Sequence, residues 1–379
     1  MSNANEPGPR VAARMRILHT EASLGWGGQE IRILDEAEGI SGRGHSVALA
    51  APREAPIFEA ALKRGLDALS LPIARKSPRG FFALRRWLQA HPVDVINTHS
   101  STDSWLAALA CATLAGAPAI VRTRHISASI PTNLPTRWLY RAATRHVVTT
   151  GEGLRLQLIR DNGLAPERTT SIPTGIDAAR FIPGSRDAAR RLTGLPPDRR
   201  LVGIVATLRS WKGHRYLIEA LSRLPEDVGL VVVGDGPQRR NIESKIRELG
   251  VGDRVWLAGN QGHVLSWLQS LDVFALPSYA NEGVPQALVQ AMLCGLPCVT
   301  TACGGIGEIA RDGTTAILVR TEDAADLTRG LEKALGDTEL RKRLGTAARV
   351  YCAANLSVET MLDRMEKVFL DAASFRASH

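Results

Sequence analysis

The amino-acid sequence predicts an α/β fold of two doubly wound parallel-sheet domains that face each other across a cleft. Short β-rich runs alternate with helical segments along nearly all of the 379 residues, as in parallel sheets with crossover helices. The series of strands also begins again midway, and a chain of this length exceeds one ordinary hydrophobic core. In such folds ligands bind at the carboxyl ends of the strands.

Each expected strand is a short apolar run that ends in a polar or glycine-rich turn. In the first half the strands are expected at Arg16–His19, Ser46–Ala50, Val93–Asn97, Ala119–Thr123, His146–Thr149 and Ser171–Thr174. In the second half they are expected at Leu201–Ala206, Gly229–Val233, Arg254–Leu257, Val273–Leu276, Cys298–Thr300 and Ala316–Val319. We therefore expect a disordered leader (1–15), a first Rossmann-like domain (16–178), a second Rossmann-like domain (179–355) and a terminal helix (356–379).

Composition and charge limit the class of protein. The chain is 44% hydrophobic and 22% charged, and it lacks an apolar run long enough for a transmembrane helix. The first residues carry no apolar signal core, so the cytoplasm is the expected compartment. The net charge of +9 indicates an anionic partner, which could be nucleic acid, a membrane surface or a phosphorylated substrate. Cys294, Cys298 and Cys303 form no paired C-x2-C pattern, so no zinc site is expected.

The stretch from Ser278 to Thr301 carries the strongest signal of a binding site. A strand that ends at Pro277 is followed by a loop with Glu282 and by a helix expected to run to about Cys294. The amino end of that helix presents free N–H groups and the positive end of the helix dipole, which suit a phosphate. Glu282 beside this end and Gln290 further along could hold sugar and ribose hydroxyls. The alternative is a solvent-facing first turn, where glutamate is favoured anyway.

Two other loops combine glycine or cations with the end of a strand. Gly27 and Gly28 open the first helix, where glycine permits close approach of the backbone to an anion; a plain tight turn explains them equally well. Arg209 and Lys212 follow the first strand of the second half. They could neutralise a diphosphate leaving group, although exposed cations are usually only solvated surface.

Polar side chains also follow two strands of the first half. His125 ends one strand and suits a sugar pocket, although a lone histidine is more often structural. His99 and Ser100 follow the preceding strand in the same way. No D-x-D pattern, which commonly holds the metal of a nucleotide diphosphate, occurs in the chain.

Three motifs of the chain resemble one family. The first motif resembles the E-x7-E region of the retaining family-4 glycosyltransferases, which have the GT-B fold. It consists of Glu282-Gly283-Val284-Pro285 and Ala291-Met292, and it ends at Pro297. Gly175-Ile176-Asp177 resembles the family's connection between domains, and Lys212-Gly213 matches part of its basic pair. Two positions depart from the pattern. Gln290 stands where the second glutamate is usual, and Thr207 stands where the arginine is usual, with Arg209 two positions on.

The resemblance implies a function and a set of site residues. It implies transfer of a hexose-type sugar from a nucleotide diphosphate sugar, with retention and without a metal or other cofactor, in lipopolysaccharide or cell-surface polysaccharide synthesis. It implies that Glu282 and His125 lie at the reaction centre. The implied donor-binding residues are Gly28, Arg209, Lys212, Gly283, Val284, Gln286, Ala287 and Gln290. On the acceptor side the implied residues are Gly27, His99 and Ser100. It also implies that the terminal helix packs back on the first domain.

Two stretches of the first half combine cations with aromatic residues. They are Arg75–Trp87 and Arg137–Arg145, the second with an arginine every fourth residue on an expected helix. A solvated helix face explains each stretch alone. Together they favour peripheral contact with the anionic inner face of the plasma membrane, and hence a lipid-linked or lipopolysaccharide-type acceptor.

Other functions remain open from the sequence. A nucleotide-sugar epimerase or a glycosyl phosphorylase could use the same fold, because fold does not fix function. The epimerase would need carboxylates for proton abstraction, and no such cluster is evident beyond Glu282. The basic charge would also suit a nucleic-acid-binding protein, although no nucleic-acid motif occurs and no nucleic-acid partner is expected. A non-catalytic scaffold is favoured only by Gln290, which stands where the family usually has a glutamate.

Overall fold

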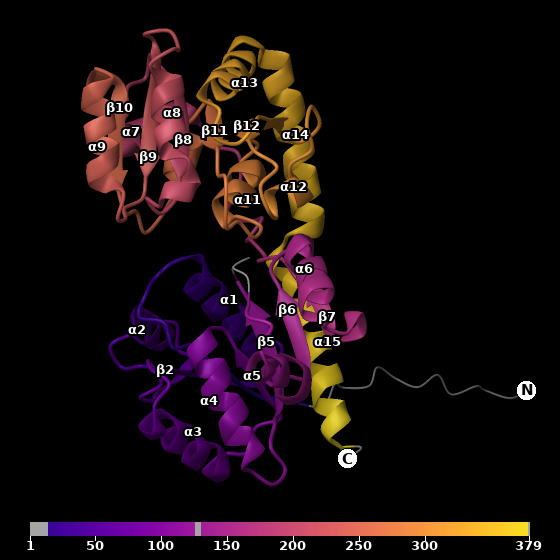
Figure 1. The fold of residues 1–379 in the computed structure, drawn as a ribbon. Helices are drawn as coiled ribbons and strands as arrows, with labels where there is room; N and C mark the ends of the chain where they lie inside the picture. The colour runs from indigo at the N-terminus through magenta and orange to yellow at the C-terminus, as the bar shows by residue number, and fades with distance from the viewer. Residues whose placement is uncertain (1–13, 126–129, 378–379) are drawn as a thin grey trace, which may run out of the picture.

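The computed structural model describes residues 14–125 and 130–377, and it has two α/β domains with one sheet each (Figure 1). The first sheet has the strand order β3-β2-β1-β4-β5-β6-β7, and the second has the order β10-β9-β8-β11-β12-β13. All the strand pairings within them are parallel, so the predicted fold class is confirmed. In each sheet the winding reverses beside its opening strand, between β1 and β4 and between β8 and β11, where doubly wound sheets hold ligands.

The first sheet has one strand more than the sequence predicts. Its strands are β1 (Arg16–Thr20), β2 (Ser46–Ala51), β3 (Asp67–Ser70), β4 (Val95–Thr98), β5 (Ala119–Arg124), β6 (His146–Thr149) and β7 (Thr169–Ser171). The strand missed from the sequence is β3, a short edge strand whose end residues are exposed and whose middle is only half-buried. It therefore lacks the apolar run that marks its neighbours.

The helices of the first domain cover both faces of this sheet. They are α1 (Gly28–Gly42), α2 (Pro56–Lys63), α3 (Pro78–Ala90), α4 (Ser101–Ala112), α5 (Leu134–Trp138) and α6 (Glu152–Asn162), with a π-helical turn at Leu139–Ala143 and a 3-10 turn at Pro166–Arg168. The prediction that one helix carries Arg137, Arg141 and Arg145 was wrong. Helix α5 ends at Trp138, a π-helical turn follows it to Ala143, and Arg145 lies beyond that turn.

The last helix, α15 (Val358–Ala377), lies along the first domain although it follows the second in sequence (Figure 1). Met365 and Phe369 are buried with Val95 and Val121 in the core beneath the first sheet. A Cβ atom at Gly39 of α1 would come within 2.3 Å of the side chain of Leu362, so glycine permits the close packing of α1 and α15. The chain end thus completes the first domain.

Two segments link the domains, and they run side by side. The backbone N–H of Ile176 donates to the carbonyl of Leu356 at 2.8 Å, and Ile176 and Ser357 form a parallel bridge. A Cβ atom at Gly175 would lie 2.5 Å from the carbonyl oxygen of Ser357. This close approach accounts for the glycine of the Gly175-Ile176-Asp177 motif.

The second sheet follows the predicted strands closely. Its strands are β8 (Arg200–Val205), β9 (Val228–Val233), β10 (Val255–Gly259), β11 (Val273–Leu276), β12 (Cys298–Thr300) and β13 (Ile317–Leu318). Its helices are α7 (Arg186–Thr193), α8 (His214–Leu221), α9 (Arg239–Glu248), α10 (Leu265–Gln269), α11 (Gln286–Leu293), α12 (Ile306–Ile309), α13 (Ala324–Gly336) and α14 (Thr338–Asn355), with 3-10 turns at Ser210–Lys212 and Gly252–Arg254.

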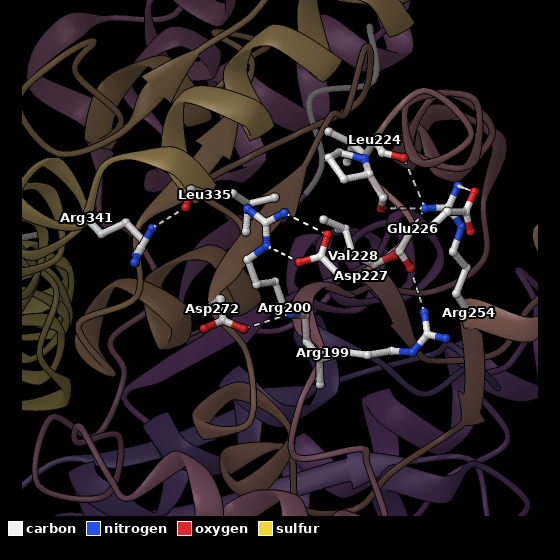
Figure 2. Close-up of polar contacts among 12 residues, drawn as sticks. Arg199, Arg200, Leu224, Glu226, Asp227, Val228, Arg254, Asp272, Leu335 and Arg341 are labelled. Atoms are coloured by element: carbon white, nitrogen blue, oxygen red, sulfur yellow. Dashed lines mark hydrogen bonds and ion pairs between the residues drawn. The ribbon is translucent and has the colours of Figure 1, made fainter.

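Many basic side chains hold the amino edge of the second sheet together (Figure 2). Arg200 pairs with Asp227 at 2.7 and 2.9 Å. Arg254, which is 3% exposed, donates to the carbonyl oxygens of Leu224 and Pro225. Because these cations are satisfied within the domain, this part of the net positive charge forms no free basic surface. It also lies at the edge opposite to the ends of the strands where ligands are expected.

None of the helices in residues 14–125 and 130–377 combines the length and the apolarity that crossing a bilayer requires.

Candidate functional site

The loop after β11 buries Glu282 rather than exposing it. Glu282 is 5% exposed, and its Oε1 lies 2.6 Å from Nζ of Lys212, at the end of the 3-10 turn that follows β8. The turn from Gly304 to Gly305 covers the loop, because a Cβ atom at Gly304 would lie 2.2 Å from the carbonyl oxygen of Glu282. The solvent-facing first turn considered from the sequence is therefore wrong for Glu282, and the two residues assigned separate roles form one ion pair.

Helix α11 begins at Gln286, after the loop that carries Glu282. Its N-cap is Pro285 and its first residue is Gln286, so Glu282 precedes the helix by four residues. Val284 is buried within the loop, whereas Ala287 and Gln290 are half-buried on the helix. Gln286 and Gln290 are four residues apart and share one face of α11. The amino end of α11 thus carries the side-chain amide of Gln286, and Gln290 follows one turn further along the same face.

Arg209 lies away from this ion pair. It lines a groove of about 490 Å³ with His214 and Tyr279, between the 3-10 turn and helices α8 and α9, and neither Lys212 nor Glu282 lines that groove. The guanidinium lies 5.7 Å from the ring centroid of Trp211. Arg209 thus lines this groove, whereas Lys212 pairs with Glu282.

Three histidines form a continuous array at the carboxyl edge of the first sheet. His19 belongs to β1, His99 follows β4 and His125 follows β5, which are neighbouring strands. Nδ1 of His19 lies 3.0 Å from Nε2 of His99, and Nδ1 of His99 lies 3.0 Å from Nε2 of His125. The sequence singled out His99 and His125, but not His19.

Burial keeps all three imidazoles neutral. Burial lowers the pKa of His19 to about 3. The pKa of His99 is also well below its usual value, first because of burial and then because of His125 and His19. For His125, burial comes first and the positive charges of Arg32 and Arg124 add to it. At neutral pH these rings can therefore exchange hydrogen bonds only as neutral groups.

A buried polar network links helix α1 to strands β4 and β5, which lead to His99 and His125. Arg32 of α1 lies 3.5 Å from Glu36 with neither side chain exposed, and its guanidinium donates to the carbonyl of Ile172 at 2.7 Å. Asn97 donates to Glu36 at 2.9 Å and accepts from the hydroxyl of Thr123 at 2.9 Å. Burial raises the pKa of Glu36, and Arg32 opposes the shift.

Two further carboxyl groups lie beside the glycine loop. Oε1 of Glu21 accepts from the backbone N–H of Ser23 at 2.7 Å, and Oε2 accepts from the side chain of Gln29. Asp103 accepts from the hydroxyl of Thr20 at 2.8 Å. Burial and then the charge of Asp103 raise the pKa of Glu21 to about 8.

Ser100 is part of a helix cap. It is the N-cap of α4 in a capping box with Asp103, and its hydroxyl donates to Asp103 at 2.6 Å. The backbone N–H of His99 also donates to Asp103, at 2.9 Å. Ser100 therefore serves the local structure of α4, while its neighbour His99 joins the histidine array.

The two sheet edges meet at the domain boundary. Nε2 of Gln286 donates to the carbonyl of Gly28 at 2.6 Å, and a Cβ atom at Gly28 would lie 3.0 Å from that nitrogen. A Cβ atom at Gly283 would lie 2.7 Å from the hydroxyl of Thr150 and 3.5 Å from the carbonyl of His125. The structure thus brings Gly28, His125, Gly283 and Gln286 together, whereas Gly27 is the N-cap of α1.

Glu308 of α12 makes a second contact between the domains. Its carboxylate accepts from the backbone N–H groups of Glu152 and Gly153 at 2.8 Å each. These are the first residues of α6, whose free amides and dipole favour an anion. The sequence analysis missed Glu308, because a four-residue helix carries no periodic signal. In the described part of the chain, no group of three or more His, Cys, Asp or Glu residues is arranged as a metal site.

Comparisons with known proteins agree with this architecture. The family described as Glycosyltransferase Family 4 matches residues 26–180, and the family described as Glycosyl transferases group 1 matches residues 185–351. Between them these matches cover most of the chain and divide at the link between the domains. Each of the two domains therefore matches a glycosyltransferase family.

Individual relatives give the degree of likeness. The chain is 33% identical over 227 residues to a D-inositol 3-phosphate glycosyltransferase of Stackebrandtia nassauensis, which covers 56% of this chain and 51% of the relative. The chain thus spans about half the length of this curated relative. Among solved structures it resembles Anabaena Alr3699/HepE in complex with UDP and glucose (TM-score 0.83, 21% identity, 93% and 99% of the two chains). It also resembles WaaG, a glycosyltransferase involved in lipopolysaccharide biosynthesis (TM-score 0.71, 20% identity, 93% and 99%).

Proposed function

We propose that the protein transfers a hexose-type sugar from a nucleotide diphosphate sugar to a hydroxyl group of an acceptor, with retention of anomeric configuration and without a metal. One observation carries the proposal: at the carboxyl end of the second sheet, Glu282 lies four residues before α11 in sequence and pairs with Lys212 of the turn that follows β8. A cation, a carboxylate and the amino end of the helix that follows suit the three parts of such a donor.

Each of these groups has a distinct task in the proposed reaction. Negative charge grows on the diphosphate as the glycosidic bond breaks, and Lys212 together with the amino end of α11 would stabilise it. Glu282 would accept hydrogen bonds from sugar hydroxyls once Lys212 turns toward the diphosphate. Gln290, on the same helix face as Gln286, would hold the ribose through its amide.

The acceptor would approach from the first domain. The backbone of His125 borders Gly283, so the histidine array lies next to the proposed donor loop. Glu21 and Asp103 are buried and already accept hydrogen bonds from their own neighbours, so neither is placed as a free base. This supports retention, in which the leaving phosphate takes the proton of the attacking hydroxyl on the same face.

We propose a lipid-linked or lipopolysaccharide-type acceptor and contact with an anionic membrane. On and before α3, Arg75, Lys76, Arg79 and Arg86 are exposed, and Phe82 among them is 64% exposed. Cations around a protruding aromatic ring suit an anionic bilayer, at about 1 kcal/mol per basic residue. The Arg137–Arg145 stretch contributes less, because Arg141 is bonded to the carbonyl of Asn162.

The test is a screen of the purified protein against UDP-, GDP- and ADP-linked sugars by thermal shift and by release of the free diphosphate, with and without EDTA. We expect stabilisation by one nucleotide class and slow release that EDTA does not change. Release that needs inorganic phosphate would favour a phosphorylase, and release abolished by EDTA would contradict the metal-free reaction. Acceptor arms with lipopolysaccharide precursors and with D-inositol 3-phosphate then separate the proposed acceptor from that of the curated relative.

A further inference from the structure

The histidine array behaves as one unit because each of its two links holds a single proton. A neutral imidazole has one N–H donor and one bare nitrogen acceptor. If His19 donates from Nδ1, then His99 must accept at Nε2 and carry its own proton on Nδ1. His125 then accepts at Nε2 and carries its proton on Nδ1. The opposite arrangement places the proton on Nε2 in all three rings.

The environment of His19 decides between the two arrangements. Nε2 of His19 is buried and has no hydrogen-bond partner in the described residues. The rings of Phe369 and His19 are nearly perpendicular, and their centroids lie 6.1 Å apart. A buried N–H group without a partner is rarer in proteins than a buried acceptor without one. The bare nitrogen of the array therefore belongs at Nε2 of His19.

We propose that His19 and His99 are positioning residues that fix His125 in the tautomer protonated at Nδ1. In this state the reaction-centre histidine donates a hydrogen bond from Nδ1 and offers no basic nitrogen there. The tautomer follows from the array alone. Its catalytic meaning, a donor to an oxygen atom of the sugar or of the acceptor, rests on the proposed function.

The geometry leaves little freedom for the rings to escape this arrangement. The rings of His19 and His99 are nearly parallel, with an interplanar angle of 8° and centroids 5.3 Å apart, and the centroids of His99 and His125 lie 5.2 Å apart. Protonation does not interrupt the array at neutral pH, because burial lowers the pKa of each ring. The tautomer of a histidine is set by the hydrogen bond of its other nitrogen, and here that bond continues to the next ring.

The direct test is nitrogen NMR of the full-length protein with ¹⁵N-labelled histidine, using long-range couplings that distinguish protonated from bare ring nitrogens. We expect His19, His99 and His125 to carry the proton on Nδ1. Two other residues are internal controls. His45 accepts from the backbone N–H of Met15 at Nδ1 and must be protonated at Nε2. His91 faces the carbonyl of Trp87 with Nδ1 and must be protonated there. A proton on Nε2 of His19, or mixed tautomers at neutral pH, would overturn the proposal.

Two substitutions of His19 separate positioning from simple packing. His19→Gln keeps an N–H donor for Nε2 of His99, whereas His19→Phe fills the space without one. We expect the Nδ1 tautomer of His125 to persist in His19→Gln and to be lost in His19→Phe. On the donor found in the screen, His19→Phe should lower kcat about tenfold with KM little changed, and His19→Gln should recover most of it. If both variants fold, show the same tautomer of His125 and turn over at equal rates, then His19 only fills space in the core. The NMR result stands even if no sugar donor is found.

Discussion

The carboxyl edges of the two sheets are built in different ways. At the first edge, side chains bond to one another: His19, His99 and His125 form an array, and Glu21 and Asp103 accept from their own neighbours. At the second edge, tight glycine turns bring backbone groups together, and Lys212 and Glu282 form an ion pair.

This difference indicates two tasks. Groups that bond to one another within the protein hold a fixed geometry, because breaking such a bond leaves a buried polar atom without a partner. An ion pair in the loops at the end of the sheet can instead exchange its partners for those of a ligand. We interpret the first edge as the part that orients the reaction and the second as the part that binds the donor.

The largest effect is expected from Glu282→Gln, which removes the carboxylate but keeps its shape. The loss of a group that acts directly at the reacting sugar should lower kcat by about 10²–10³-fold. Glu282→Ala is a poorer choice, since it leaves the half-buried cation of Lys212 without a partner as well as a cavity. Turnover and thermal stability should be measured together. A stable Glu282→Gln protein with normal turnover would remove Glu282 from the mechanism.

A smaller loss is expected from Lys212→Met, which should act on binding more than on turnover. A hydrogen bond to a charged group contributes about 1.5–3 kcal/mol, which corresponds to about 10–100-fold in donor affinity. Calorimetric titration with the nucleotide sugar measures this directly. Arg209→Met is the matched control, because Arg209 lines a different groove. A greater loss from Arg209→Met would mean that the groove, and not the ion pair, receives the diphosphate.

The contact between the two edges should be sensitive to Gly28→Ala. The added Cβ would lie 3.0 Å from Nε2 of Gln286, and overpacking of about 1 kcal/mol corresponds to about fivefold in kcat/KM. Gly42→Ala, at the other end of α1, has nothing within 4 Å of its added Cβ and should be neutral. Equal values for the two variants would indicate that the contact is not maintained during the reaction.

The smallest effect concerns the pH dependence of stability. The pKa of Glu21 is raised from 4.5 to about 8 by burial and by Asp103. Between these values the native protein holds a proton that the unfolded chain has lost, so stability falls as the pH rises through this range. Denaturant titrations should show that Glu21→Gln reduces this fall. Parallel pH profiles of the free energy of unfolding in both proteins would contradict the raised pKa.

Much of the fold could be predicted from the sequence, because a parallel strand buried on both faces leaves a continuous apolar run. The prediction failed where that signal is absent. The edge strand β3 is half-exposed, and Glu282 is buried in a loop that Gly304 and Gly305 cover. Such long-range contacts leave no local pattern.

The site was predictable in its residue types but not in its pairings. His19 occupies the same kind of position as His99 and His125, and the strand order β1-β4-β5 would have linked all three. The sequence could not predict which partners the side chains of Arg209 and Lys212 contact, because the spacing of two residues in a loop does not fix where their side chains point. The ion pair of Lys212 and Glu282 joins residues 70 apart in sequence.

The division of tasks between the two edges is tested most directly by calorimetric titration of three proteins: the wild type, Glu282→Gln and His125→Gln. Each is titrated with the nucleoside diphosphate and with its sugar derivative. We predict that all three bind the free diphosphate alike and that only Glu282→Gln loses the additional affinity for the attached sugar. Loss of diphosphate binding in a folded His125→Gln protein, with Glu282→Gln unaffected for both ligands, would contradict the account.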